Sequence, residues 1–287
     1  MPSLSAAIGM APAVGDISGN VDGGVTGSMV ELTYLPIFQA GGFDCAWEST
    51  GGASYTSVSV VLLPGGAGGL SRVPPDVNQP SATGWGGEAR VGCFNQEGFN
   101  CRYDVLVGRT WLDVATYTTG DTAAFPAASE ALSRDILAAV RAAGDPTPLW
   151  IAPTSTLPVD CAALGSYGTQ EPDLLTPLQP IQAEAMRLVG AYQCAWLASD
   201  GHGSVQAFVM PGGAWAWSVH PAKSNQSITL SPLAGLGDGA SGGCSSIIPD
   251  CVVHTIAHGG WLGLEVSSTG ATVSTAAATA KQMLSLG

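Results

Sequence analysis

Apolar and polar residues alternate along two short stretches, residues 43–47 and 192–196, and both stretches end in the tripeptide Cys-Ala-Trp. In each stretch every second residue is an aromatic residue or a cysteine, so these side chains share one face of an extended chain. A helical pattern precedes the second stretch over residues 180–189 and stops at Gly190. The pattern therefore predicts a β-strand at each Cys-Ala-Trp sequence.

Further strands follow each of these two stretches. Residues 55–63 and 204–210 contain many β-branched residues and stop at a Pro-Gly-Gly turn. Later come residues 103–117 and 252–266, each with a glycine near its middle. A glycine inside a strand pattern often marks a bulge, so we expect one long, bulged strand at each place.

Each half of the sequence closes with a helical pattern. The first covers residues 122–143, with Asp121 as its expected N-cap and Gly144 as its stop, and the second covers residues 271–286. Antiparallel strands followed by a closing helix predict an α+β layer in each half.

The same elements recur in the same order about 150 residues apart. The matching positions include a close pair of cysteines in each half, Cys93 and Cys101 in the first and Cys244 and Cys251 in the second. So long a period indicates a domain duplication, because solenoid repeats are about 20 to 50 residues long. We expect two tandem homologous domains, each an antiparallel sheet with flanking helices and disulfide staples. The expected boundaries are residues 1–144, a linker and lead-in segment at residues 145–160, and residues 161–287.

Composition narrows the possible partners. The chain has 287 residues, of which 46% are hydrophobic and 11% charged, and its formal net charge is −13. A charge of this sign repels nucleic-acid backbones and anionic lipid surfaces, so we expect no nucleic-acid partner. No run of 18 or more apolar residues occurs, so no transmembrane segment is expected. The first residues lack the basic region of a secretory signal, so any such signal is expected to have been removed.

Seven cysteines, six of them expected in disulfides, predict an oxidising compartment outside the cytoplasm. The close pairs, Cys93 with Cys101 and Cys244 with Cys251, are expected to close small loops. Cys161 is expected to bond to Cys194, which leaves Cys45 as a free buried thiol. A bridge between Cys45 and Cys161 is the competing assignment.

Metal binding is the alternative use of the second cysteine pair. Cys244, Cys251, His254 and His258 loosely resemble a two-Cys, two-His zinc site. However, residues four apart in a strand lie about 13 Å from each other, which is too far for one ion. The first half of the chain also has no histidines at the matching positions. We therefore expect no metal and no cofactor.

Catalytic motifs are weak in this sequence. Residues 239–243 match Gly-x-Ser-x-Gly, but a nucleophile elbow needs a strand before it and a helix after it, and we expect a glycine-rich loop on both sides. Asp113 and Glu265 occupy non-equivalent positions and are expected on solvated strand faces. No catalytic residues are predicted.

Tryptophans that occur in only one half are the better candidates for binding, because the shared core does not require them. These are Trp85, Trp215 and Trp217, and the last two are expected on a hairpin strand with both indoles on one face. His220, a turn residue, completes the candidate ligand-binding set. Filling the core is the competing role for the tryptophans.

The Cys-Ala-Trp strand, the close cysteine pairs, the alanine-rich closing helix and residues 157–164 carry a resemblance. With these features the chain resembles cysteine-bearing lipoproteins and secreted proteins of high-GC actinobacteria. It is more distantly similar to the extracellular sensor domains of actinobacterial serine/threonine kinases. The resemblance implies a location in the cell envelope and, for many such proteins, no known catalysis.

These features lead to one expected function with two alternatives. We expect an extracytoplasmic binding or sensing protein without catalysis, whose partner is a small molecule, a glycan or an envelope protein. The first alternative is a secreted hydrolase that is active in one repeat only. The second is a structural component of the cell envelope.

Overall fold

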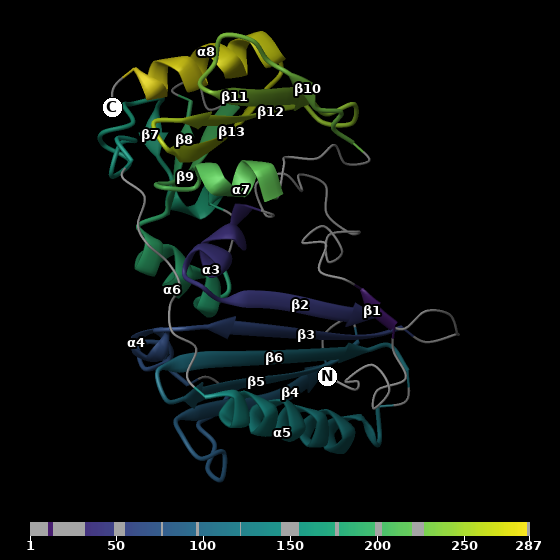
Figure 1. The fold of residues 1–287 in the computed structure, drawn as a ribbon. Helices are drawn as coiled ribbons and strands as arrows, with labels where there is room; N and C mark the ends of the chain where they lie inside the picture. The colour runs from purple at the N-terminus through teal and green to yellow at the C-terminus, as the bar shows by residue number, and fades with distance from the viewer. Residues whose placement is uncertain are drawn as a thin grey trace. The chain divides into compact units, whose positions relative to one another are not determined.

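The structure is a computed structural model with an α+β fold built on two antiparallel sheets (Figure 1). It describes residues 11–13, 32–48, 55–75, 77–95, 98–120, 122–144, 155–175, 178–198, 203–219 and 227–285. The chain divides into two compact units. Most of unit 1 is Ala40–Trp150, and it also takes in Gln179–Ala185. Most of unit 2 is Ile151–Leu178 and Met186–Gly287, and it also takes in Gly23–Gln39.

The sheet of unit 1 has the strand order β1-β2-β3-β6-β5-β4, and all neighbouring strands are antiparallel. The α5 helix lies against one face of this sheet and contacts β5 and β6 (Figure 1). A short helix, α4, follows β3. The bounds are β1 Ala11–Ala13, β2 Phe43–Glu48, β3 Thr56–Leu63, α4 Ala67–Leu70, β4 Ala89–Asn95, β5 Phe99–Val107, β6 Thr110–Thr118 and α5 Phe125–Ala143.

The core of unit 1 forms between α5 and the strand face that it covers. Val58 and Val60 on β3 lie two residues apart, as do Leu112 and Val114 on β6, and Ile136 and Leu137 come from the helix. Period-two and helical spacing therefore bring their apolar faces together, as the sequence predicts.

The predicted long strands at residues 103–117 and 252–266 are each two strands joined by a tight turn. Gly108 has φ of 60° in the turn between β5 and β6. At the matching turn of unit 2, His258 has φ of 53° and Gly259 has φ of 75°. The turn of unit 2 therefore has positive φ at both central residues, which is typical of a type I′ hairpin turn. The expected bulge is wrong at both places, because the glycine reverses the chain.

The face of the unit 1 sheet opposite α5 carries a buried polar network. Arg102 donates from Nε and Nη2 to the two carboxylate oxygens of Asp113, at 3.1 and 2.7 Å. Asp104 lies beside Asp113 in the strand register and accepts from the indole of Trp111 and the amide of Gln79, each at 2.7 Å. The expectation of a solvated Asp113 is therefore wrong, because Arg102 compensates the buried charge.

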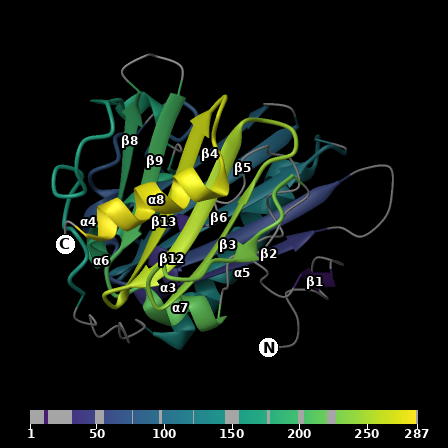
Figure 2. The same cartoon turned by 90° about the horizontal axis from the view of Figure 1, so that it is seen from above.

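The sheet of unit 2 has the strand order β10-β11-β12-β13-β9-β8-β7, again antiparallel throughout. The α8 helix crosses one face of it, above β12 and β13 (Figure 2). Thr272 caps α8 through a reciprocal pair of hydrogen bonds with Thr275. The bounds are β7 Thr169–Gln170, β8 Tyr192–Leu197, β9 Gly203–Met210, β10 Ser231–Pro232, β11 Gly239–Cys244, β12 Asp250–Ala257, β13 Gly260–Ser268 and α8 Val273–Leu284.

Three further helical segments flank the strands: α3 Leu35–Gln39, α6 Pro180–Val189 and α7 Ala214–Val219, with the short 3-10 helix η2 at Pro172–Leu174. Trp215 and Trp217 lie on α7, so the predicted hairpin strand is wrong. Within unit 2, the buried Gln39 donates to the Pro211 carbonyl at 2.8 Å and accepts from the Trp215 indole at 3.1 Å. These bonds hold α3 against the start of α7.

The predicted disulfides are all present: Cys93–Cys101, Cys161–Cys194 and Cys244–Cys251. Cys45 is the free cysteine, as predicted, and the competing Cys45–Cys161 bridge is wrong. Each of the two close pairs joins directly opposite residues of neighbouring strands.

Replacing Arg102 tests the buried polar network. Arg102→Met should destabilise unit 1 by about 3 to 5 kcal/mol, because it leaves buried carboxylates without their cation. Burial already raises the pKa of Asp113, and losing Arg102 raises it further. Since folding of the variant then favours protonated Asp113, the loss of stability should be smaller at about pH 5 than at about pH 8. Urea unfolding followed by tryptophan fluorescence measures both values.

Lys281→Met provides the control, because Lys281 is exposed on α8 and its loss removes the same charge. It should change stability by less than about 0.5 kcal/mol. If Arg102→Met loses little stability, or loses the same amount at both pH values, Arg102 does not compensate the buried charge of Asp113.

Candidate functional site

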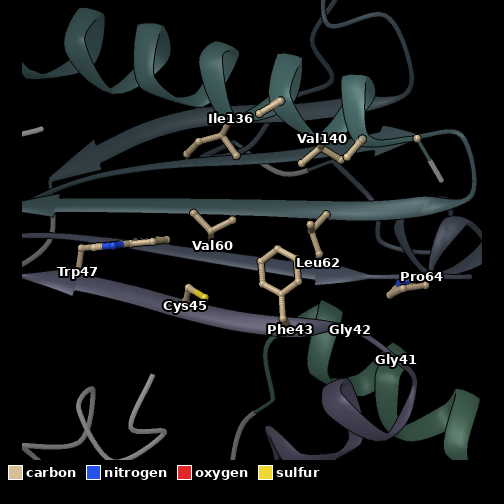
Figure 3. Close-up of a pocket in the computed structure, with 13 residues that line it drawn as sticks. Gly41, Gly42, Phe43, Cys45, Trp47, Val60, Leu62, Pro64, Ile136 and Val140 are labelled. Carbon is tan, nitrogen blue, oxygen red and sulfur yellow. The ribbon is translucent and has the colours of Figure 1, made fainter. Parts of the chain in front are cut away.

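Unit 1 contains an open, apolar cavity of about 550 Å³ between the last turns of α5 and the strands β2 and β3 (Figure 3). We call this cavity the slot. Small-molecule sites commonly have volumes of about 300 to 1,000 Å³. The residues that line it are Gly41, Gly42, Phe43, Cys45, Trp47, Val60, Leu62, Pro64, Ile136, Ala139, Val140, Ala143 and Gly144.

The strand wall of the slot follows from the alternation of β2 and β3. Phe43, Cys45 and Trp47 are two residues apart and therefore lie on the same face of β2. The strand register sets Cys45 beside Val60 and Phe43 beside Leu62. All five side chains point toward α5 (Figure 3).

The helix wall combines larger and small residues. Ile136 and Val140 are one turn apart on α5 and point toward the strands (Figure 3). Ala139 and Ala143 line the same wall and fill little volume. The last turns of α5 therefore form one wall of the slot without closing the space between the helix and β2 and β3.

The chemistry of the slot is apolar with one thiol. None of the lining residues carries a charge, and Phe43 is 42% exposed although it is a large aromatic residue. Burial raises the pKa of the Cys45 thiol, and the neighbouring carboxylate of Asp44 raises it further. The thiol is therefore protonated at neutral pH, and the slot suits an apolar guest rather than an ion.

Asp44 lies on the opposite face of β2, because strand side chains alternate. Its burial raises its pKa to about 6, and its Oδ1 atom has no hydrogen-bond partner within the described part of the chain. It is therefore ionised above about pH 7, where its charge acts on Cys45.

The predicted ligand-binding tryptophans do not line the slot. Trp85 is buried in the core of unit 1, where Arg134 lies 4.1 Å above its ring. In unit 2, Trp215 bonds to Gln39, and Trp217 packs edge-on against Trp261 at 5.2 Å. His220 lies outside the described residues. A binding role for these four residues stays a prediction.

Ser241, the serine of the weak hydrolase motif, faces a histidine, His254. Ser241 lies on β11 opposite His254 on β12, so the predicted glycine-rich loop is a strand. Both residues have a polar atom without a hydrogen-bond partner among the described residues, Ser241 Oγ and His254 Nδ1. Burial lowers the pKa of His254 to about 4. This pair therefore has neither the strand-turn-helix setting nor a bonded orienting group.

Metal ligation has no support in the described ranges. They hold no group of three or more His, Cys, Asp or Glu residues arranged to bind an ion. The two cysteines of the loose zinc motif bond to each other.

The slot is not predicted by the sequence patterns. One signal for it was present, the odd number of cysteines, which leaves Cys45 without a partner. This signal does not say which part of a sheet face stays uncovered, because that depends on segments distant in the chain.

No family model matches this chain, and neither a curated protein nor a solved structure matches it significantly. The resemblance to actinobacterial envelope proteins stays a prediction. No helix among the described residues is long and apolar enough to cross a membrane.

Asp44→Asn tests the electrostatic control of the thiol. Removing the carboxylate charge should stabilise the thiolate, so Cys45 should react about two to ten times faster with the neutral reagent dithiodipyridine at about pH 8. The difference should shrink below about pH 6, where Asp44 is protonated in the parent protein. The measurement is the absorbance of released thiopyridone over a pH series.

Asp135→Asn removes an equal charge from the exposed side of α5 and should leave the rate unchanged. Equal rates for the parent protein and Asp44→Asn across the series would contradict the coupling.

Proposed function

We propose that this chain is an extracytoplasmic binding or sensing protein without catalysis, and that the slot of unit 1 is its recognition site. The observation that carries the proposal is an uncharged cavity that leaves Phe43 42% exposed. Exposed apolar surface is costly in water, so proteins that keep such a surface commonly use it for binding. An apolar ligand gains free energy by covering it.

The disulfides support an extracytoplasmic compartment. Three disulfides would be reduced in most cytosols and persist in an oxidising compartment. The resemblance to actinobacterial secreted proteins and lipoproteins supports a cell-envelope location.

A duplication of one ancestral unit supports the choice of site. The strands β2-β3-β6-β5-β4 follow the same spatial and chain order as β8-β9-β13-β12-β11. Each sheet has a disulfide between its last two strands in this order. We infer that residues 1–144 and 161–287 are copies. Function is then sought where the copies differ, and the slot is such a place.

An apolar dye tests the slot directly. Nile red, which is neutral, should bind saturably with a dissociation constant on the order of micromolar, because the cavity can bury most of its surface. Ala139→Trp places an indole in the slot and should weaken binding at least tenfold. Ala138→Trp adds the same side chain at the neighbouring exposed position, which does not line the slot, and should leave binding unchanged. Dye fluorescence gives the constants.

Absence of saturable binding would refute the proposal. Equal losses in Ala139→Trp and Ala138→Trp would also refute it, since the dye would then bind outside the slot. Circular dichroism of both variants shows whether either has lost its fold.

A further inference from the structure

The strand wall of the slot has a counterpart in unit 2. The strand β8 pairs with β9 as β2 pairs with β3, so Cys194 lies beside Ala207 as Cys45 lies beside Val60. The tripeptide Cys-Ala-Trp fixes the correspondence. The corresponding side chains are Phe43 and Tyr192, Cys45 and Cys194, and Trp47 and Trp196.

In unit 2 a polypeptide segment, residues 155–168, covers this strand face. Cys161 of the segment bonds to Cys194, and the Tyr192 hydroxyl donates to the carbonyl of Pro158 at 2.6 Å. Tyr167 packs edge-on against Trp196 with ring centroids 5.3 Å apart. Each of the three strand positions therefore has its own contact with the segment.

Two leucines anchor the same segment in the core. Leu157 and Leu164 are 4% and 1% exposed and belong to the core cluster that also holds buried residues of α8 and β8. Under this cover Cys194 and Trp196 are 2% and 1% exposed. The segment thus supplies apolar side chains and one cysteine.

In unit 1 the same strand positions face the slot. Phe43 is 42% exposed, and Cys45 and Trp47 are half-buried. The other six cysteines of the chain are bonded in pairs, so no second thiol of this sequence is left for Cys45. Among the residues that the structure describes, no segment fills this wall in unit 1 as residues 155–168 fill its counterpart in unit 2.

We propose that the slot binds a segment of a second protein that carries apolar side chains and one cysteine, and that this cysteine forms a disulfide with Cys45. The proposal rests on the slot being the recognition site and names the class of its ligand. The guest matches residues 155–168 in kind: a leucine, a cysteine and a second leucine, at positions 157, 161 and 164. A lipid chain would fill the slot without using the thiol.

The covalent step is thiol–disulfide exchange and needs no external oxidant. The guest cysteine arrives in a mixed disulfide with a small thiol. The Cys45 thiolate attacks the guest sulfur, the new bond joins Cys45 to the guest, and the small thiol leaves as thiolate and takes up a proton. One disulfide is broken and one is formed.

A peptide with the sequence of residues 155–168 is the probe, because its fit to such a wall is already seen in unit 2. Its cysteine carries a thiopyridyl group as the leaving thiol. We expect the folded protein to form the mixed disulfide at Cys45 at least ten times faster with this peptide than with a peptide in which Leu157 and Leu164 are serine. Absorbance of released thiopyridone gives the rates, and mass spectrometry of non-reduced digests locates the bond.

Three protein variants complete the test. Cys45→Ser should abolish the adduct, Ala139→Trp should slow it at least tenfold, and Ala138→Trp should leave it unchanged. In denaturant both peptides should react at equal rates, because no folded slot remains to distinguish them.

A second measurement separates this inference from the proposed function. The probe with Cys161→Ser should compete with Nile red for the slot. Nile red binding without competition, or equal rates for the two peptides, would overturn the inference and leave the proposed function standing. Peptide binding only after deletion of residues 1–10 would assign the slot to the chain's own first residues and also overturn it.

Discussion

The feature on which each unit depends is the mismatch between the width of one helix and the width of the five longer strands of its sheet, β2-β3-β6-β5-β4 or β8-β9-β13-β12-β11. A helix with its side chains is about 10 Å across, whereas five strands about 4.8 Å apart extend over about 19 Å. One helix therefore covers about half of a sheet face. In unit 1, α5 contacts β5 and β6, and in unit 2, α8 contacts β12 and β13. The apolar face of β2 and β3, or of β8 and β9, needs a different cover.

The two units meet this need in different ways. Unit 2 folds residues 155–168 over β8 and bonds Cys161 to Cys194 across a separation of 33 residues. Such a bond reduces the conformational entropy of the unfolded chain and so offsets the cost of ordering an irregular segment. Unit 1 has a longer helix, Phe125–Ala143 against Val273–Leu284, but its last turns present alanines to the strands. Because these alanines fill little volume, a space stays open between the last turns of α5 and the strands β2 and β3, and this space is the slot.

Local patterns predicted most strands, the closing helices and the three disulfides, because alternation and cysteine spacing are properties of neighbouring residues. They failed where one signal fits two structures. Gly108 suits either a bulge or a turn, and the structure has a turn since the apolar run on both sides pairs with itself. Trp215 and Trp217 suit a strand by spacing, but Gln39, far away in sequence, bonds to Trp215 on a helix.

Asp113 looked solvated because its partner Arg102 lies on another strand. The slot was beyond prediction for the same reason, since its walls come from residues about 70 to 100 positions apart.

The state of Cys45 bears on how a thiol could select one guest in an oxidising compartment. Enzymes that exchange disulfides broadly lower the pKa of the attacking cysteine, which makes the thiolate abundant. In this protein burial and the Asp44 carboxylate raise the pKa of Cys45, so its thiol reacts slowly with disulfides that it meets by chance. A guest held in the slot by its apolar side chains keeps its sulfur close to Cys45, and this high effective concentration compensates for the scarce thiolate. Selectivity would then come from the fit of the guest to Phe43, Trp47 and α5, and the disulfide would make permanent only those encounters that last.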